Sequence, residues 1–454
     1  MPVNFLQSNK LRTPSMFWIL GWMLISALIL PTQAFAQTNT GAATQPAETK
    51  TEQKTVPADT AKAPTQQPFG LDSLTMTGDW FGIGPKMREV GVNARFFWNT
   101  QYFSVMGGGL ETGSKFSSTY DAILTFDLGK MGLIPDADML VHGRQQWGKS
   151  VNPWTGASQQ VNDDADGDRS LYVDQLWYRQ HFLDRKIALQ FGYLDYQTIV
   201  DRNVYANSED KQFMNSALDN NPLFPTASAT GLGAALYVKP CEWYTMILGA
   251  GDAERLPLYK PGFSTAFHDR ALFLGYLEND FHMKIPTEKG DLPGNYRFGL
   301  VYDPLVRDRF VDPRKAPDQR GDDYGFYMSH DQMVYRENDT DKQGLGAFFR
   351  YAYRHSDTHR FSQFWSIGTS YTGLVPKRDA DTLGFAFAQM KDSPAFRRWR
   401  NPDSGNENYY ELYYAIQITP WFVLTPDIQY IDNPGGDEAV SHAIAGGLKA
   451  RVTF

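Results

Sequence analysis

The chain has 454 residues, a formal net charge of −8 and one cysteine, Cys241. The negative balance argues against nucleic acid as a partner, and a single cysteine excludes an internal disulfide framework and a paired-thiol metal or redox site. Aromatic residues make up 14% of the chain although its mean hydropathy is only −0.44. This combination fits a protein that is apolar outside and polar inside.

Residues 1–36 have the three-part pattern of a cleaved export signal. Lys10 and Arg12 precede an apolar run over 16–30, and Ala34-Phe35-Ala36 forms a small-residue cleavage site. The run is short for a membrane-spanning helix, so an uncleaved anchor is the weaker interpretation. Cleavage removes two positive charges and no acids, which changes the net charge from −8 to −10.

Residues 37–70 form the next segment, which is rich in Thr, Ala, Gln, Pro and Lys. Such a composition cannot bury enough apolar surface to offset its ordering entropy, so we expect a disordered periplasmic linker. The following segment, 71–92, is predicted to carry a short periplasmic helix over Pro85–Val90. Proline stands near the start of this helix and Gly91 is its stop signal.

Residues 93–454 alternate between apolar and polar side chains with the period of a β-strand. In the first such run, four apolar residues share one face: Ala94, Phe96, Trp98 and Tyr102. Four polar residues share the other face: Asn93, Arg95, Asn99 and Gln101. One face suits lipid and the other suits water. Some runs, such as Gly325–Glu337, alternate too poorly for their faces to be assigned.

Runs of this kind predict about sixteen strands. Their cores are expected at 93–103, 118–128, 138–147, 170–181, 186–194, 230–239, 242–251, 271–282, 295–303, 324–336, 343–355, 362–372, 382–390, 408–419, 421–431 and 440–454. Short and long connections alternate between them, as periplasmic turns and outer loops do in outer-membrane barrels. We therefore predict an all-β fold, a transmembrane antiparallel β-barrel. A soluble sandwich or propeller is the alternative, but it should bury Val, Ile and Leu instead of presenting aromatics at strand ends.

The alternation also predicts which polar residues face the lumen. The filter candidates are Arg95, Asp121, Arg144, Gln146, Arg297, Glu411 and Asp427. Further residues of the same face are Arg350, Arg354, Gln429 and Lys449. A barrel of this size is wide enough for water, so we expect these charges to stay solvated without buried partners. The simpler interpretation is that most of these charged residues only line a water-filled channel.

Three loop features invite a functional interpretation. Ser208 is a candidate cap for a helix over Glu209–Leu218. Asp164, Asp166 and Asp168 alternate like the start of a calcium loop, but Arg169 stands where such a loop needs glycine. A solvated acidic loop is the better interpretation, with weak calcium binding as the alternative; no metal or other cofactor is expected. The basic cluster 397–400 is expected in an outer loop, facing lipopolysaccharide phosphates or solvent.

The eight histidines are scattered, and the sequence holds neither Gly-x-Ser-x-Gly nor a histidine pair with metalloprotease spacing. Nothing in it requires catalysis.

From about Thr77 to Phe454 the chain resembles the carbohydrate-selective, OprB-type porins. The motifs that carry the resemblance include Thr77-Gly78-Asp79-Trp80-Phe81-Gly82, Gln212-Phe213-Met214-Asn215-Ser216-Ala217, Leu292-Pro293-Gly294-Asn295-Tyr296-Arg297, Glu407-Asn408-Tyr409-Tyr410-Glu411, Pro426-Asp427-Ile428-Gln429-Tyr430 and Asn433-Pro434-Gly435-Gly436. Phe81 and Gly84-Pro85 depart from the family pattern. The resemblance implies a sixteen-stranded barrel of the bacterial outer membrane, narrowed by folded-in loops, through which glucose and similar sugars diffuse without energy coupling.

Two alternatives stay open at this stage. One is a general or ion-selective porin without a sugar-binding filter, and the other is an outer-membrane barrel enzyme or adhesin. The expected partners are neutral sugars, outer-membrane lipid and lipopolysaccharide. The last strand ends Val452-Thr453-Phe454, and a terminal aromatic is typical of outer-membrane proteins, so we expect the assembly machinery to recognise this strand. The oligomeric state stays open, because lipid-facing and subunit-facing aromatics look alike.

Overall fold

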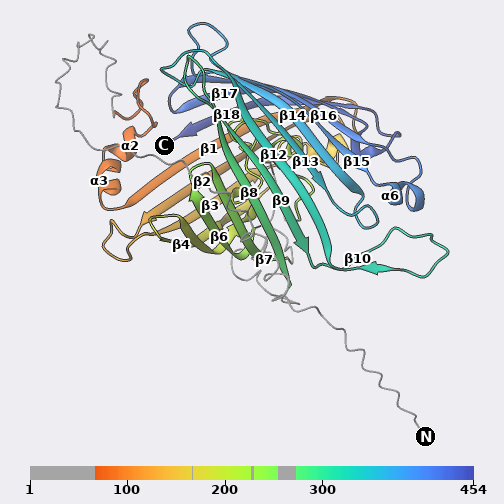
Figure 1. The fold of residues 1–454 in the computed structure, drawn as a ribbon. Coiled ribbons are helices and arrows are strands. Elements are labelled where there is room, and N and C mark those ends of the chain that lie inside the picture. The colour runs from red at the N-terminus through yellow and green to blue at the C-terminus, as the bar shows by residue number, and fades with distance from the viewer. Residues whose placement is uncertain (1–66, 166, 226–229, 254–271) are drawn as a thin grey trace. The chain divides into compact units, whose positions relative to one another are not determined.

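The computed structural model describes residues 67–165, 167–225, 230–253 and 272–454. Within these ranges, sixteen strands form one closed barrel, as the alternation predicts (Figure 1). The strands are β1 Val92–Gly107, β2 Gly113–Asp127, β3 Ala137–Gly148, β4 Arg169–Phe182, β5 Ile187–Asp195, β6 Thr230–Cys241, β7 Tyr244–Asp252, β8 Phe273–Ile285, β9 Leu292–Asp303, β12 Asp323–Arg336, β13 Gly344–Tyr353, β14 Phe361–Thr372, β15 Thr382–Asp392, β16 Glu407–Thr419, β17 Phe422–Asp432 and β18 Ala443–Thr453.

Short elements decorate the barrel. They are α2 Gly78–Phe81, α3 Gly84–Glu89, α4 Asn152–Thr155, η1 Tyr196–Thr198, α5 Ser216–Asp219, α6 Pro394–Trp399 and η3 Pro434–Gly436, with the two-residue strands β10 Arg307–Asp308 and β11 Gln319–Arg320. No helix in the described part of the chain is both long and apolar enough to cross a membrane.

Every barrel strand is antiparallel to its neighbours, and the sheet order follows the sequence. The one departure is that β9 pairs with β12, because β10 and β11 form a separate two-stranded ribbon. The barrel closes where β1 pairs with β18, which places Phe97 opposite Thr453. Closure leaves no unpaired strand edge, a condition that a sheet crossing lipid must meet.

The two faces of the sheet are those that the alternation predicts. On β1, Tyr102 is 54% exposed on the outer surface, whereas the inward side chains of Asn99 and Gln101 are each 1% exposed. β12, whose faces were not assignable from the sequence, places Tyr327 inward with 2% exposure. Gly299 on the paired strand β9 makes room for this ring, since a Cβ there would stand 1.9 Å from Tyr327 Cζ.

The connections alternate in length, as expected. At one end of the barrel the turns are short, and Leu183, Asp184 and Arg185 all adopt positive φ in the tight turn between β4 and β5. At the other end are the long segments after β3, β5, β9 and β15. The short-turn end also carries the N-terminal helices and the end of β18 (Figure 1). In an outer-membrane barrel it is the periplasmic end.

The predicted N-terminal helix is present as α3, which ends one residue before the expected Val90. Gly91 follows with φ +90°, the conformation that stops the helix. This segment is tied to the barrel: Trp80 Nε1 donates to the carbonyl oxygen of Ala94 at 3.1 Å, and the Met76 amide donates to the carbonyl oxygen of Thr453 at 2.8 Å. The predicted signal, 1–36, and the predicted linker up to 66 lie outside the described residues.

Candidate functional site

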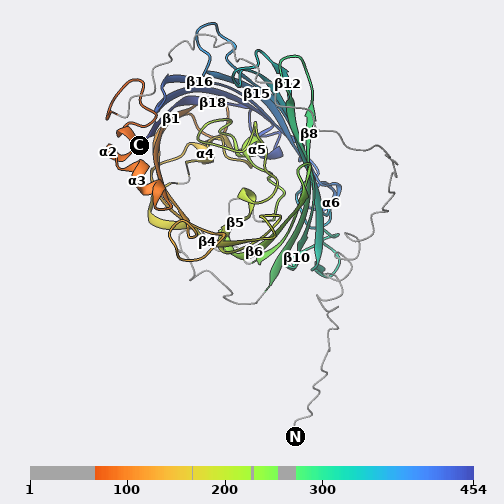
Figure 2. The same cartoon turned by 60° about the vertical axis from the view of Figure 1, so that its left-hand side comes forward.

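Two long segments fold into the barrel instead of projecting from it. They connect β3 to β4 and β5 to β6, and we call them the first and the second inner loop. Figure 2 looks into the barrel and shows α4 of the first and α5 of the second inside the ring of strands. Many apolar side chains of the second loop are nearly or fully buried there, among them Val200, Ala206, Phe213, Met214, Ala217, Leu218 and Phe224.

Aromatic rings hold the second inner loop against the wall. Phe213 packs on Tyr413 of β16 with ring centroids 4.9 Å apart, and on Phe348 of β13 at 5.7 Å. Phe224 meets Tyr327 of β12 at 6.0 Å. This part of the lumen is therefore a packed core, in contrast to the wet channel that the charged face alone suggests.

Polar wall residues bind the backbone of the inner loops. Glu411 accepts hydrogen bonds from the amides of Met214 at 2.6 Å and Asn215 at 3.0 Å. Gln429 donates to the carbonyl oxygen of Val161 at 2.7 Å. Asp427, which is 6% exposed, accepts from Gln429 at 2.9 Å. The wall thus satisfies backbone groups that would otherwise be buried without partners.

Arg350 is the fully buried counterpart of Glu411 on the other side of the second loop. Its guanidinium donates to the carbonyl oxygens of Leu218 at 2.8 Å and Asp201 at 3.3 Å, and to Asn207 Oδ1 at 3.2 Å. Burial raises the pKa of Asp201, a loop residue, to about 6, and the guanidinium of Arg350 opposes that rise.

Arg297 anchors the same loop through an acid. Its guanidinium donates to Asp331 at 2.6 Å and to Asp280 at 3.1 Å, and its side chain is only 5% exposed. Asp331 Oδ2 in turn accepts from the amide of Val204 at 3.3 Å. Arg297 therefore stabilises the wall and the loop tip, without a free face toward the lumen.

Arg144 on β3 is the point where both inner loops meet. Its Nη2 lies 2.5 Å from Asp164 of the first loop and 3.4 Å from Glu209 of the second. Its Nε lies 3.7 Å from Asp121 on β2. The side chains of Arg144 and Glu209 are still 17% and 27% exposed, so this cluster keeps a face toward open space.

Beside this cluster His142 lies between two acids. Its Nε2 is 2.7 Å from Asp121, and its Nδ1 is 3.0 Å from Asp174 on β4. Gln101 and Thr119 donate to the side-chain and main-chain oxygens of Asp164 at 2.8 and 3.0 Å. The charges of β1–β4 are thus held in one hydrogen-bonded layer.

The structure tests the expectation that the seven filter candidates stay solvated. That expectation is wrong for Asp121, Arg297, Glu411 and Asp427, which are all buried and hydrogen-bonded or ion-paired, because the inner loops cover them. Four further lumen-facing residues are buried in the same way: Arg350, Arg354, Gln429 and Lys449. Gln146 is also buried, at 2% exposure.

Among the filter candidates, Arg95 and Arg144 keep exposed surface within the barrel. Two loop residues that the alternation does not reach lie close to them: Glu209 is 3.4 Å from Arg144, and Lys211 lies near enough to Arg95 for their charges to interact. Arg202 of the same loop is exposed. Their approach to the strands is not visible in the sequence, because no periodic pattern marks a loop that turns inward.

Two loop predictions are wrong. The helix expected over Glu209–Leu218 is absent, and only the four-residue α5 forms, with Asn215 as its cap. The acidic stretch that starts at Asp164 is not a solvated loop at that residue, which is 2% exposed and paired with Arg144. Asp168 accepts from the amide of Gly148 at 2.7 Å, and Asp166 lies outside the described residues. No cluster suited to a metal occurs within the ranges that the structure describes.

The sequence and the fold were compared with known proteins. The family model for the carbohydrate-selective porin, OprB family, matches residues 112–454. Porin B of Pseudomonas aeruginosa is 23% identical over 433 residues, which cover 85% of this chain and 92% of that protein.

Two solved structures share the fold. The high-pH structure of Pseudomonas putida OprB covers 85% of this chain and 100% of its own, with 19% identity and a TM-score of 0.75. The low-pH structure covers 84% of this chain and 99% of its own, with 17% identity and a TM-score of 0.55. The family match, which spans all but the first strand of the barrel, makes the chain a member of the OprB family of carbohydrate-selective porins, a sugar-selective channel of the bacterial outer membrane and not an enzyme.

Proposed function

We propose that neutral sugars pass along the side of the lumen that the inner loops leave open, and that Arg144 with Glu209 forms its filter. The single observation that carries this proposal is that these two opposite charges lie 3.4 Å apart and both keep exposed surface, while the lumen charges under the loops are covered. Arg95, farther toward the periplasmic end of β1, is also exposed, and we assign it to the same path.

The chemistry of this pair suits a neutral polyol. A sugar hydroxyl both donates and accepts hydrogen bonds, so a guanidinium and a carboxylate side by side can bind it together. An anion meets the exposed carboxylate of Glu209, and a simple cation meets the guanidinium groups of Arg144 and Arg95. Mixed charge therefore favours a solute without net charge.

The seven filter candidates divide into three roles in this proposal. Arg95 and Arg144 contact the permeating sugar. Asp121 and Gln146 hold the charged layer around Arg144, whereas Arg297, Glu411 and Asp427 position the inner loops that narrow the channel. Passage follows the concentration gradient, because the contacts are weak and exposed enough for a sugar to leave as readily as it enters.

Single-channel conductance in planar bilayers tests the proposal, with glucose, maltose and gluconate as probes. We expect glucose and maltose to interrupt the ion current in a saturating manner, and gluconate to do so less. Glu209→Gln should weaken the glucose block by about tenfold, as expected for the loss of a charge-assisted hydrogen bond. Arg400→Gln, an outer-loop substitution away from the lumen, is the matched control and should leave the block unchanged.

If the Arg144–Glu209 pair is not a sugar filter, the channel should behave in bilayers like a general or ion-selective porin. Channels would then open without any sugar interrupting their current, with an ion preference that Glu209→Gln alters. That outcome would overturn the filter while leaving the barrel and its family membership intact.

We propose two further partners. α6 carries Arg397 and Arg398 on an outer segment, and Arg400 follows it with its guanidinium over the Phe310 ring at 5.9 Å. This basic patch suits lipopolysaccharide phosphates, and loss of phosphate-containing lipopolysaccharide binding in a triple Arg→Gln variant tests it. At the other end, β18 with Phe454 is the segment for the outer-membrane assembly machinery. Whether the barrels associate is open to measurement by sedimentation in detergent.

A further inference from the structure

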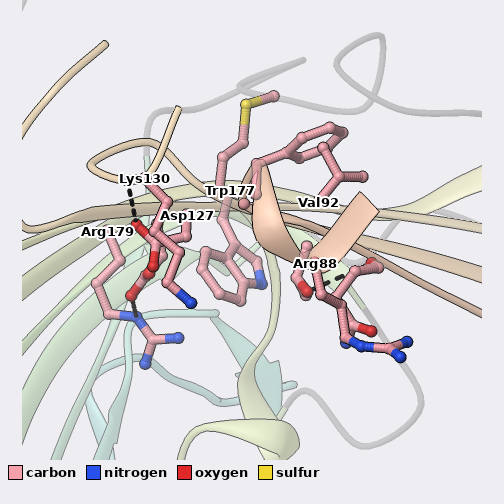
Figure 3. A pocket seen from close by; sticks show the side chains of 12 residues that line it. Arg88, Val92, Asp127, Lys130, Trp177 and Arg179 are labelled. Carbon is pink, nitrogen blue, oxygen red and sulfur yellow. Dashed lines mark hydrogen bonds and ion pairs between the residues drawn. The ribbon is translucent and has the colours of Figure 1, made fainter. Parts of the chain in front are cut away.

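A pocket with polar and apolar walls opens at the periplasmic end of the barrel. It has a volume of about 370 Å³ and is bordered by β1–β4 and by α3. In Figure 3 the Trp177 indole lies between Asp127 on one side and Arg88 on the other, with Arg179 next to Asp127. Asn93, Thr125, Lys130 and Asp138 complete the polar lining.

The lining groups retain hydrogen-bonding capacity. The Arg179 guanidinium stacks on the Trp177 ring at 4.6 Å, and its Nε lies 4.0 Å from Asp138 without a hydrogen-bond partner among the described residues. Within the same ranges, the side-chain amide of Asn93 makes no hydrogen bond either. The pocket therefore offers an amide, a guanidinium and carboxylates around one aromatic ring.

The pocket lies in line with the Arg144 filter. Asp121 and Asp127 both face inward on β2, and at about 3.3 Å per residue they are about 20 Å apart along the strand. On β3 the same interval separates Arg144 from Asp138. A solute that leaves the filter toward the periplasm therefore reaches this pocket next.

We propose that this pocket is an exit subsite that binds one sugar ring after the ring has passed the filter; the proposal rests on the proposed function. Charges of both signs line it: Lys130 and Arg179 with Asp127 and Asp138. Asp138 also bonds His181 at 2.7 Å, and Arg88 is paired with Asp79 at 2.9 Å, outside the lining. That mixture of charges suits a neutral polyol better than an ion. The volume is near the lower end of ligand pockets, about 300 to 1,000 Å³, and suits one ring more than a long chain.

The subsite gives the channel a stepwise path. Two weak sites in series let a solute move by short transfers, and neither site needs to hold it tightly. Because the pocket is open to the periplasmic side, sugar added from that side reaches it without crossing the filter.

The test is current-fluctuation analysis with glucose added to one side of the membrane at a time. The intact protein should show two classes of block, and glucose on the periplasmic side should populate both. The double substitution Asn93→Ala with Arg179→Gln should weaken one class by about fivefold, the effect of losing one or two hydrogen bonds. Lys284→Gln, an exposed charge on the same rim outside the pocket, is the control.

The outcomes separate this proposal from the previous one. If Glu209→Gln weakens one class and the pocket variant leaves both classes unchanged, the exit subsite is wrong and the filter stands. If the intact protein shows a single class of block, and the pocket variant loses that class, the filter proposal is wrong. A current that glucose never interrupts overturns both. Asn93→Ala alone is the control for misfolding. We expect it to fold normally, because the side chain that it removes makes no hydrogen bond among the described residues.

Discussion

Nη2 of Arg144 on the barrel wall lies 2.5 Å from Oδ1 of Asp164 on the first inner loop, and the carboxylate is almost completely buried. The pair links the wall to a segment that the sequence pattern places outside the barrel. Removing one partner of a buried pair leaves the other charge without compensation.

Arg144→Gln should therefore release the first inner loop. We expect the docked loop to lose about 3 kcal/mol, the lower end of the cost of breaking a buried ion pair. The loop should become sensitive to protease added from the outer side. Addition of Asp164→Asn in the same chain should restore most of the protection, since no lone charge then remains. Equal cleavage rates in the single and double variants would contradict the pairing.

The docking of this loop should depend on pH through Asp164. Burial raises the pKa of Asp164 to about 7, above the value of about 3.9 for a free aspartate. The docked state thus binds a proton more readily than the released state, so docking weakens as pH rises from about 4 to about 7 and then stays constant. We expect proteolysis of the loop to be faster at pH 8 than at pH 5.

Asp164→Asn is the control for that pH profile and should flatten most of it. A weaker slope should remain, because burial also raises the pKa of Glu209 on the second inner loop. If the variant keeps the full slope, Asp164 is not the titrating group.

Glu411 offers a graded test of backbone anchoring. Glu411→Ala leaves the amides of Met214 and Asn215 without an acceptor. It should lower the free energy of unfolding by about 2 to 6 kcal/mol, since each buried unpaired group costs about 1 to 3 kcal/mol. Glu411→Gln keeps one acceptor oxygen and should cost about half as much. Urea unfolding in lipid vesicles measures the free energy of unfolding of both variants. Equal losses in the two variants would show that the acceptor oxygens of Glu411 do not hold the loop.

Gly251 on β7 should not tolerate a side chain. A Cβ there would stand 2.0 Å from the hydroxyl oxygen of Tyr196, which packs on this strand from the start of the second inner loop. Gly251→Ala should destabilise the barrel by about 1 to 3 kcal/mol through overpacking. Gly275→Ala on the neighbouring strand is the matched control, because its Cβ would meet nothing closer than 3.8 Å. Urea unfolding of the two variants should differ by that amount.

Phe454→Ala should slow assembly more than it weakens the folded barrel. The Phe454 ring packs on Phe96 with centroids 4.8 Å apart, and such a pair contributes about 0.5 to 1.5 kcal/mol. Phe96→Ala removes the same ring contact but keeps the terminal aromatic. Folding yields in proteoliposomes with the assembly machinery should fall for Phe454→Ala only. Equal yields for both variants would argue against recognition of the terminus.

The alternation of the strands predicted more of the fold than of the site. It placed Asp121 and Glu411 on the inner face, because a period of two residues is a local property of the chain. It did not predict that both are covered, because their partners are distant in sequence: Met214 donates to a carboxylate on β16.

The helix predicted over Glu209–Leu218 fails to form for the same reason, because the partners of its backbone groups are distant in sequence. Glu209–Leu218 has capping and apolar residues suited to a helix, but the amides of Met214 and Asn215 bind the wall instead of carbonyls within the segment. When side chains of the barrel wall bond the backbone of a loop, helical hydrogen bonds no longer give that loop an advantage. The local sequence of the loop does not indicate that such side chains are near.

The wall residues that hold the second inner loop act mostly on its main chain: Glu411 binds two amides and Arg350 binds carbonyl oxygens. Main-chain groups are the same whatever side chains they carry. The route of the loop can therefore persist while residues such as Arg202 and Lys211 are exchanged. A barrel built in this way can be retuned to a new solute by substitutions in a single segment, with its strands left unaltered.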